Sequence, residues 1–386
     1  MRRLAVLRRS NPRRMLTAQV WNEVLHLCAN VGAAVFAAKA DPPVASPMPL
    51  PHLVPWEANS IQRKLANLGV TELLSISDPD SQALHDARLR WDYFQTKDAL
   101  NTLRSVSILI HKGLTREVCN KFGIPISNGY WIESPKSLSD HMLRLSGVVV
   151  VKPVNRWSTE GISYCSTADL PHHLQPWLGP VVVEEFWSGE EVSVEVVRVQ
   201  RTTSVIGWAV KGPTSPTSAP LLRLRYAEGK ETPPALRDAA RSIVEAVDYE
   251  GIMEAEFIVA PSGRWVLTEV NPRPSGVTPL LARSQGRSSV AVAISMFYGA
   301  QLIGSHSCHV CDFAVDHDAV SKIRPLLRSE LEMHPALDGY PPRCYVTERS
   351  FDTLMQRVVQ IEQATGLSIA NQLKDRKKAY EDIVHM

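Results

Sequence analysis

The segment GIMEAEFIVAPSGRWVLTEVNPRPSG, residues 251–276, carries acidic and amide side chains in an otherwise apolar pattern. Its central Pro-Ser-Gly tripeptide lies between two runs that are typical of strands, which predicts a β-hairpin. With the turn centred between Ser262 and Gly263, Glu256 faces Glu269, and Glu254 faces Asn271. All four side chains share one face, because residues two apart in a strand point the same way. Carboxylate and amide oxygens on adjacent strands are ligands that Mg²⁺ takes in proteins, usually beside phosphate oxygens.

The same register predicts apolar neighbours for these acids. Ile258 would pair with Leu267, and Ala260 with Trp265, on the face that carries the carboxylates. Like charges about 5 Å apart destabilise a sheet unless positive charge lies between them. An apolar setting therefore favours a metal site over the alternative, which is a hairpin edge whose charges are solvated.

A constrained arginine follows the hairpin directly. After Asn271 the sequence reads PRPSG, with Arg273 between two prolines that restrict the loop and fix the direction of its side chain. A guanidinium beside magnesium ligands suits a phosphoryl group, because its planar fork contacts two oxygens at once. The hairpin and this loop together indicate phosphate chemistry.

Two lysines and an acidic loop are further candidates for binding. Lys112 opens HKGLTREVCNKFGIPI, and Lys152 ends the strand-like GVVVVKP, a place where ligands often bind in α/β folds. Each lysine taken alone is more typical of solvated surface. In VVVEEFWSGEEVSVEVV, residues 181–197, a short loop could offer backbone groups to a flat base while Glu190 or Glu191 accepts hydrogen bonds from a sugar. A charged β-turn is the common alternative.

Three regions would position these residues. Residues 1–105 alternate strand-like and helix-like segments, which is typical of a small α/β domain with a parallel sheet. Its expected strands are 4–7, 33–38 and 73–76, and its expected helices are 17–29, 61–68 and 81–103. The six prolines of 41–55 indicate an extended connection rather than a helix or a central strand.

The two following regions have an α+β texture. In residues 106–300 the expected strands are 148–151, 181–183 and 192–199, which are rich in valine, and the expected helices are 114–122, 234–247 and 288–298. In residues 301–386 we expect a strand at 343–347 and a helix at 351–364.

Composition excludes several classes of protein. The net charge is +2, so nothing favours nucleic acid as the main partner. No apolar run approaches the roughly 18 residues of a membrane span, and six scattered cysteines argue against a disulfide-stapled secreted scaffold. Six arginines occur in the first 14 residues, but the apolar run at 4–7 favours a first strand over an organelle transit peptide. These features predict a cytoplasmic protein of two or three domains.

The order and spacing of these motifs carry a resemblance. Lys112 followed by GIP, then VVVVKP, EEFWSGEEVSVE and MEAEF…TEVNPRPSG, spread over roughly 110–300, resemble the ATP-grasp superfamily. The likeness is closest to its carboxylate–amine ligase branch, which includes L-amino-acid ligases, glycinamide ribonucleotide synthetase and the carbamoyl-phosphate synthetase halves. It implies an α/β and α+β protein with the ATP-grasp fold. The implied domains are a pre-ATP-grasp domain at 1–105, an ATP-grasp domain at 106–300 and a C-terminal α+β extension at 301–386.

The resemblance also implies roles for individual residues. Lys112 and Lys152 would bind ATP phosphates, and Glu191 would hold the ribose. The adenine hinge would be Glu184, Glu185, Phe186 and Trp187. Mg²⁺, for which Mn²⁺ is an alternative, would be held by Glu256, Glu269 and Asn271, and Arg273 would stabilise the acyl phosphate. The substrate-binding candidates are Lys211, Arg223, Arg225, Ser275 and Gly276, although solvated cations are the more common interpretation of the first three.

The implied reaction is ATP-dependent ligation of a carboxylate to an amine through an acyl phosphate, with release of ADP and phosphate. The resemblance favours an amino acid or small peptide as the carboxylate substrate. It implies that the substrates are small molecules and that no membrane partner is needed, and it is compatible with a homodimer. Two alternatives stay open: a bicarbonate-activating carboxylase or carbamoyl-type kinase on the same fold, and a non-catalytic nucleotide-binding module. The sequence departs from the pattern at 154–161, which is poor in glycine, and at 211–229, which matches no substrate signature.

Overall fold

The computed structural model describes most of the chain from residue 103 onward and parts of the first hundred residues. The described residues are 3–8, 27, 34–39, 53–55, 67, 72–75, 103–134, 144–154, 156, 161–177, 179–216, 222–302, 307–326, 331–334 and 341–386. The helices expected at 17–29, 61–68 and 81–103 lie outside these residues except at single positions, as does most of the loop at 154–161. Within the described residues, no helix is both long and apolar enough to cross a membrane.

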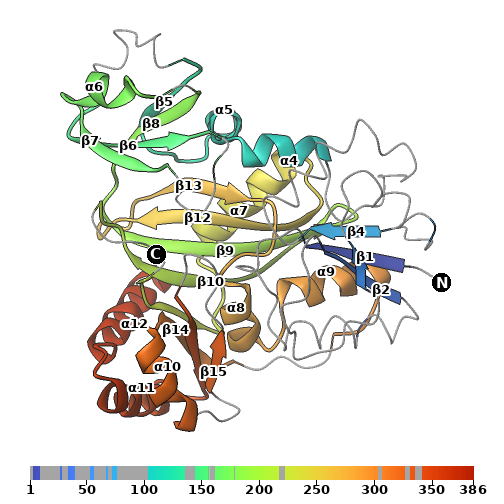
Figure 1. Cartoon of the computed structure of the whole chain (residues 1–386). Helices are drawn as coiled ribbons and strands as arrows, with labels where there is room; N and C mark the ends of the chain where they lie inside the picture. Colours follow the sequence, from blue (N-terminus) through green and yellow to red (C-terminus); the bar gives the residue numbers. More distant parts are fainter. Residues whose placement is uncertain are drawn as a thin grey trace.

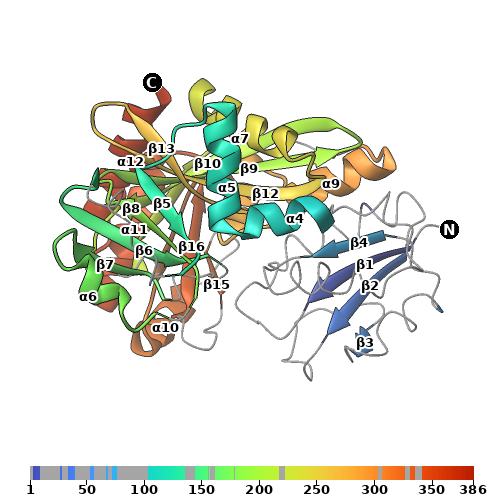
Figure 2. The same ribbon diagram turned by 90° about the horizontal axis from the view of Figure 1, so that it is seen from above.

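Four strands form the N-terminal sheet, in the order β3-β2-β1-β4. They are β1 (Arg3–Arg8), β2 (Ala34–Lys39), β3 (Leu53–Pro55) and β4 (Glu72–Ser75). Every pairing in this sheet is parallel, which confirms the prediction for the first region. The proline-rich connection ends in β3, at the edge of the sheet, where a missing backbone donor is tolerated. Figure 2 shows this sheet to one side of the rest of the chain.

An eight-stranded antiparallel sheet runs through the middle of the protein, in the order β13-β12-β9-β10-β11-β14-β16-β15 (Figure 1). Its strands are β9 (Glu190–Val199), β10 (Thr202–Pro213), β11 (Arg225–Glu228), β12 (Gly251–Val259), β13 (Trp265–Asn271), β14 (His309–Ala314), β15 (Leu331–His334) and β16 (Arg343–Glu348). The C-terminal strands β14 to β16 thus continue the sheet that the middle region begins. The domain boundaries near 105 and 300 stay predictions.

A smaller antiparallel sheet lies above the central one in Figure 1 and has the order β5-β8-β6-β7. Its elements are β5 (Gly129–Ile132), β6 (Val148–Pro153), β7 (Ser163–Ser166), β8 (Val181–Glu185) and the short helix α6 (Leu170–Leu174). The valine runs of β6 and β8 pair with each other and fill its core, which confirms the strands expected there. β-branched side chains suit such a buried, pleated surface.

Helices cover both faces of the central sheet. On the face with the main core lie α4 (Leu103–Ile110), α5 (Lys112–Phe122), α7 (Pro234–Ala246), α10 (His317–Ile323) with the 3₁₀ turn η7 (Arg324–Leu326), α11 (Phe351–Thr365) and α12 (Ala370–Val384). On the other face lie α8 (Thr278–Gln285) and α9 (Ser289–Tyr298). The C-terminal helix is docked through Tyr380, whose ring stacks on Trp208 of β10 at 3.8 Å between centroids.

Local capping explains where the predicted helices begin and end. Ser288 accepts a hydrogen bond from the amide of Ala291 at the start of α9, and Gly299 ends that helix in the left-handed region. Ser350 likewise caps the start of α11, and Gly366 ends that helix in the left-handed region. The helices expected at 114–122, 234–247, 288–298 and 351–364 are confirmed within one or two residues at each end.

The hairpin of β12 and β13 has the predicted register at its open end. Glu254 pairs with Asn271, and Glu256 pairs with Glu269. Closer to the turn, however, a bulge at Thr268 changes the pairing.

The bulge moves two apolar side chains to the opposite face. Phe257 pairs with Leu267, and Val259 pairs with Trp265. Both partners pack against the main core with Phe257, so the prediction that Leu267 and Trp265 flank the acids is wrong. One extra residue in a strand reverses the direction of every side chain beyond it, which sequence alternation alone does not reveal.

Candidate active site

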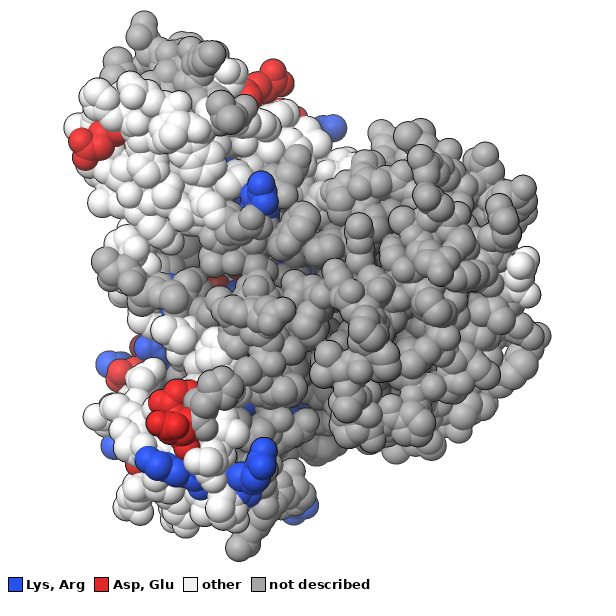
Figure 3. Space-filling view, viewed as in Figure 1, with Lys and Arg blue, Asp and Glu red and all other residues white. Residues whose placement is uncertain are grey.

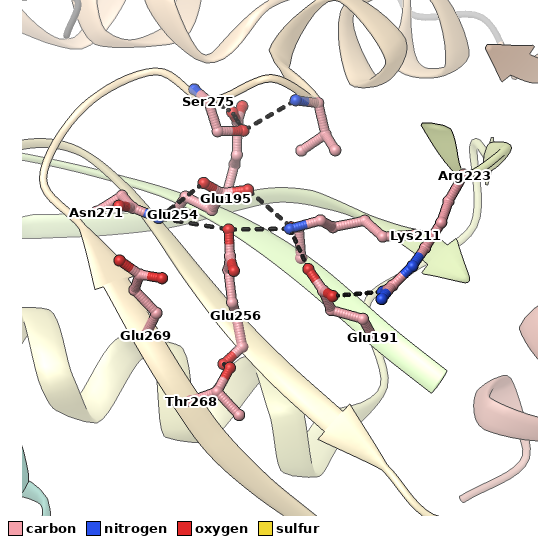
Figure 4. A network of polar contacts seen from close by, with 12 residues as sticks. Glu191, Glu195, Lys211, Arg223, Glu254, Glu256, Thr268, Glu269, Asn271 and Ser275 are labelled. Carbon is pink, nitrogen blue, oxygen red and sulfur yellow. Dashed lines mark hydrogen bonds and ion pairs between the residues drawn. The ribbon is translucent and has the colours of Figure 1, made fainter. Parts of the chain in front are cut away.

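Charged and polar side chains form a row across one face of the central sheet (Figure 4). They share that face because residues that pair on adjacent strands point the same way. The row consists of Glu269 and Asn271 on β13, Glu254 and Glu256 on β12, Glu191, Ser193 and Glu195 on β9, and Lys211 on β10. In Figure 3, charged atoms are visible in the hollow between the small sheet and the C-terminal helices.

Lys211 is the central cation of this row. Its Nζ lies 2.5 Å from Oε1 of Glu191 and 2.9 Å from Oε1 of Glu256. Arg223 donates from Nη1 to Oε2 of Glu191 at 2.9 Å. Burial alone would lower the pKa of Lys211, but the attraction of Glu191 and Glu256 raises it above its usual range. Lys211 therefore acts as a counter-ion for the acidic side chains of the same row, Glu191 and Glu256.

The structure contradicts the interpretation of three cations as solvated. The side chains of Lys211, Arg223 and Arg225 are only 16%, 10% and 13% exposed, and each is paired with a carboxylate. Arg225 pairs with Asp312, which lies 87 residues further along the chain. Their partners could not be read from local sequence.

The two facing carboxylates have opposite electrostatic situations. Burial raises the pKa of Glu256 well above its usual value; Lys211 opposes this shift, while Glu254 adds to it. Burial would also raise the pKa of Glu269, but the charges of Lys112 and Lys152 hold the pKa of that carboxyl below its usual value. The site is thus short of positive charge at Glu256 and well supplied at Glu269.

The donor set fits a hard divalent cation. Glu256 and Glu269 face each other, and Nδ2 of Asn271 donates to Glu254 at 3.1 Å and to Glu256 at 3.4 Å. These two bonds leave the amide oxygen of Asn271 as an acceptor on the same face. In the described part of the chain, no three acidic, histidine or cysteine side chains converge on one point. An open set of two carboxylates and one amide is nevertheless what Mg²⁺ uses when phosphates complete its shell. The roles of these residues as ligands stay predictions.

Two predicted phosphate ligands meet at a cavity between α5, β6, β8 and β13. Nζ of Lys112 lies 3.0 Å from Oε1 of Glu269. Lys152 is paired with Glu184, and Nη1 of Arg116 donates to the same carboxylate at 2.9 Å. All five side chains line the cavity. The structure therefore brings the two lysines next to the hairpin acids, as the phosphate hypothesis requires.

The predicted hinge connects the small sheet to the central sheet. Oε1 of Glu185 accepts from the amide and hydroxyl of Ser146 at 3.0 and 3.1 Å. The backbone oxygen of Trp187 accepts from Oγ1 of Thr214 at 2.9 Å, and Phe186 makes an edge contact with a tyrosine ring 5.9 Å away. A Cβ at Gly189 would lie 2.3 Å from a backbone oxygen of β12, so only glycine fits there. The connection is held by contacts at both ends.

Residues 272–276, here called the arginine loop, are held in place by hydrogen bonds to Glu195. Nη1 of Arg273 lies 3.5 Å from Oε2 of Glu254, and its side chain is 5% exposed. Glu195, which is fully buried, accepts from the amide of Ser275 at 3.2 Å, from its hydroxyl at 2.8 Å and from the hydroxyl of Thr278. Burial raises the pKa of Glu195 to about 7. The loop that carries Arg273 is therefore fixed by a glutamate of β9.

Sequence reasoning missed three residues of this site. Arg116 lies one helical turn after Lys112, so the spacing of four residues was its signal. Glu195 lies four residues after Glu191 in a strand, so alternation placed both on one face. Asp312 had no local signal, because its partners lie in other parts of the chain.

Comparisons with known proteins relate this arrangement to solved enzymes. No protein-family model matches the chain. A segment of 67 residues is 31% identical to the arginine-specific large chain of carbamoyl phosphate synthase from Bacillus subtilis (strain 168). That segment makes up 17% of this chain and only 6% of that protein.

Solved structures match nearly the whole chain at low sequence identity. L-amino acid ligase from Bacillus licheniformis has a TM-score of 0.68 and 14% identity, over 94% of this chain and 98% of that one. N5-carboxyaminoimidazole ribonucleotide synthetase from Thermus thermophilus has a TM-score of 0.73 and 13% identity, over 95% and 99%. The biotin carboxylase domain of 2-oxoglutarate carboxylase from Hydrogenobacter thermophilus has a TM-score of 0.71 and 12% identity, over 98% and 95%. These similarities establish the fold.

Proposed function

The chain has the ATP-grasp fold, and we propose that it is an ATP-dependent ligase that activates a carboxylate as an acyl phosphate and passes the acyl group to an amine. The observation that carries this proposal is the meeting of Lys112, Lys152 and Glu269 at one cavity. Glu269 faces Glu256 across the hairpin, and Arg273 lies 3.5 Å from the neighbouring Glu254. Cations for phosphates and oxygen ligands for a metal are the two requirements of phosphoryl transfer.

The nucleotide would lie between the small sheet and the central sheet. Lys112 and Lys152 are placed to neutralise phosphate oxygens, because both ammonium groups now neutralise glutamates that line the same cavity. The hinge at Glu184–Trp187 would contact the base through its backbone, and Glu191 would accept hydrogen bonds from the ribose. Solved structures of this fold that contain ADP or ATP support a nucleotide here.

The reacting groups would meet beside the hairpin. Mg²⁺, when bound, would neutralise charge on the phosphates, and Glu256, Glu269 and Asn271 would hold it. Arg273 would orient and neutralise the transferring phosphoryl group with its planar fork. An amino acid or small peptide is the carboxylate that the resemblance to L-amino acid ligase favours.

A second candidate function is activation of bicarbonate in place of an organic carboxylate. The similarity to a biotin carboxylase domain that was solved with MgADP and bicarbonate favours it, as does the segment shared with carbamoyl phosphate synthase. The same face of the sheet would serve, because both reactions begin with phosphorylation of a carboxylate oxygen.

Release of ADP tests both candidates. The full-length protein is incubated with MgATP and a matrix of amino acids, dipeptides and amines, with bicarbonate as a separate arm and hydroxylamine to trap acyl phosphates. We expect release of ADP that requires a carboxylate and yields a hydroxamate, and that Glu256→Gln abolishes. Release with bicarbonate alone would favour the second function. Binding of ATP without any turnover would leave a non-catalytic nucleotide-binding module and refute the ligase.

A further inference from the structure

The two glutamates at the start of β9 point to opposite faces of the central sheet, because successive residues of a strand alternate. Glu191 lies on the face that carries the row of charged and polar side chains, where it contacts Lys211 and Arg223. Glu190 points to the other face, which carries the main core and the C-terminal helix α12. Contacts on that second face can therefore act on the strand end that carries Glu191.

The last helix holds Glu190 from this second face. Nη1 of Arg376, which lies 186 residues later in the chain, donates to Oε2 of Glu190. The side chains of Arg376 and Glu190 are 9% and 22% exposed. Burial raises the pKa of Glu190, and the charge of Arg376 acts in the opposite direction. Without this cation the carboxylate would turn toward solvent, since a buried charge that has lost its partner is costly.

Helix α12 is a firm support for this contact. The ring of Tyr380 stacks on Trp208 of β10, and its hydroxyl donates to the backbone oxygen of Glu228 at 2.8 Å. Nζ of Lys377 lies 2.7 Å from Oε2 of the same glutamate. Arg376 therefore extends from a helix that packing and polar contacts fix against β10 and β11.

The backbone around Glu191 is irregular, so a side-chain support matters there. A bulge in β10 places Lys211 outside the regular pairing, just before Gly212, which pairs with Glu191. Gly212 has a φ of 109°, a value that favours glycine. The strand β9 begins only at Glu190. Because a bulge disrupts the ladder locally, side-chain contacts contribute more to fixing this end of the strand.

The hinge before Glu190 is braced by neighbouring strands. The guanidinium of Arg264, beside the hairpin turn, lies 5.4 Å from the centre of the Trp187 ring. The hydroxyl of Thr214 accepts from the amide of Gly189 at 3.0 Å, and the amide of Thr214 donates to the backbone oxygen of Gly189 at 2.8 Å. These contacts hold the segment up to residue 189, and the contact from α12 holds the next residue.

We propose that Arg376 is a positioning residue for the nucleotide: by holding Glu190, it sets the place of Glu191 against the ribose. This inference rests on the proposed function, in which Glu191 accepts hydrogen bonds from the ribose hydroxyls. Arg376 acts from the opposite side of the sheet and does not contact the nucleotide. Its loss should therefore weaken the ribose contact and leave the phosphate contacts of Lys112 and Lys152 in place.

Equilibrium binding of two nucleotides separates these contacts. Titration calorimetry on the full-length protein compares ADP with 2′,3′-dideoxy-ADP, which has the same base and phosphates but lacks both ribose hydroxyls. We expect the wild type to bind ADP about 5-fold or more tightly, the difference that roughly one hydrogen bond makes. Arg376→Gln should weaken binding of ADP by about the same factor and leave binding of the dideoxy nucleotide nearly unchanged. The ratio of the two affinities should thus approach one.

Further variants locate the effect. Glu190→Gln should reduce the ratio as Arg376→Gln does, and the double variant should reduce it no further, because both changes remove the same contact. Arg376→Lys keeps the positive charge and should retain most of the wild-type ratio. The control is Lys374→Gln, which removes an exposed cation from the same helix and should leave the ratio unchanged. If Arg376→Gln does not fold, Glu190→Gln supplies the same test.

The outcomes separate a positioning role from a loss of stability and from the ligase function. Partial unfolding would weaken both nucleotides equally, so an unchanged ratio in Arg376→Gln and Glu190→Gln refutes the positioning role. A wild-type ratio near one refutes it too. If neither nucleotide binds, the proposed function fails together with this inference. If the ratios are as expected but ATP is not turned over with any carboxylate, the positioning role stands and only the ligase proposal is lost.

Discussion

The facing glutamates of the hairpin provide a matched pair for testing the electrostatics of the site. Glu256→Gln and Glu269→Gln remove one charge each, with nearly the same shape, from side chains that pair directly. Burial and its acidic neighbours raise the pKa of Glu256, whereas lysines hold the pKa of Glu269 below its usual value. The two changes should therefore shift stability in opposite directions in the absence of metal and nucleotide.

The expected magnitudes follow from the surroundings. At neutral pH, the folded protein must either keep Glu256 charged in an unfavourable environment or bind a proton there. Either choice lowers the free energy of unfolding, by about 1.4 kcal/mol for each unit by which folding raises the pKa. Glutamine removes that cost, so Glu256→Gln should gain on the order of 1 kcal/mol, and more as pH rises. Removing one partner of a buried ion pair costs about 3–5 kcal/mol. Because Glu269 is 23% exposed, its loss of Lys112 should cost less, about 1–3 kcal/mol.

Thermal unfolding without Mg²⁺ or nucleotide measures both effects. In a chain of this size, about 1 kcal/mol moves the midpoint by roughly 1–2 °C. We expect a midpoint about 1–2 °C above the wild type for Glu256→Gln and about 1–6 °C below it for Glu269→Gln. Glu133→Gln, at an exposed position, serves as the control and should not shift. Equal shifts of the same sign for the two hairpin variants would refute the assignment of their opposite environments.

The remaining predictions concern catalysis and metal binding. Glu191→Gln should raise KM for ATP and change kcat little, because a ribose contact is made equally in ground and transition states; the reverse pattern would count against it. Arg273→Lys should slow acyl-phosphate formation, trapped with hydroxylamine in a single turnover, by about 10²–10³. A rate within a few-fold of wild type would contradict that role. Lys211→Met removes an ammonium 2.9 Å from Glu256, so Mn²⁺ binding without nucleotide, followed by electron paramagnetic resonance, should tighten about 10-fold or more. Unchanged affinity would show that the ammonium does not compete with the metal. Chelation by EDTA should abolish release of ADP, and excess Mg²⁺ should restore it.

Local patterns in the sequence determined most of the elements and part of the site. Runs of valine predicted β6 and β8 because β-branched side chains suit buried strands, and cap residues marked the ends of α9 and α11. Alternation and the position of one turn were enough to pair Glu256 with Glu269 and Glu254 with Asn271. These features depend on residues that are close in sequence.

Only the tertiary structure decided the surroundings of those residues. The bulge at Thr268 reversed the neighbours of the acids, since a single extra residue changes register in a way that composition does not encode. Strands β14 to β16 proved to extend the central sheet, which joined the C-terminal region to the site.

The charges show the same division between sequence and structure. Lys211, Arg223 and Arg225 lie in a region that matched no substrate signature, so they were only candidates for neutralising a carboxylate, and general exposure statistics favoured solvated cations. In the folded chain each is buried against a carboxylate, and the partner of Arg225 is 87 residues away. Whether a charge is solvated or paired depends on burial and on which strands become neighbours. Both are properties of the long-range sheet order, so they are fixed only when the chain folds.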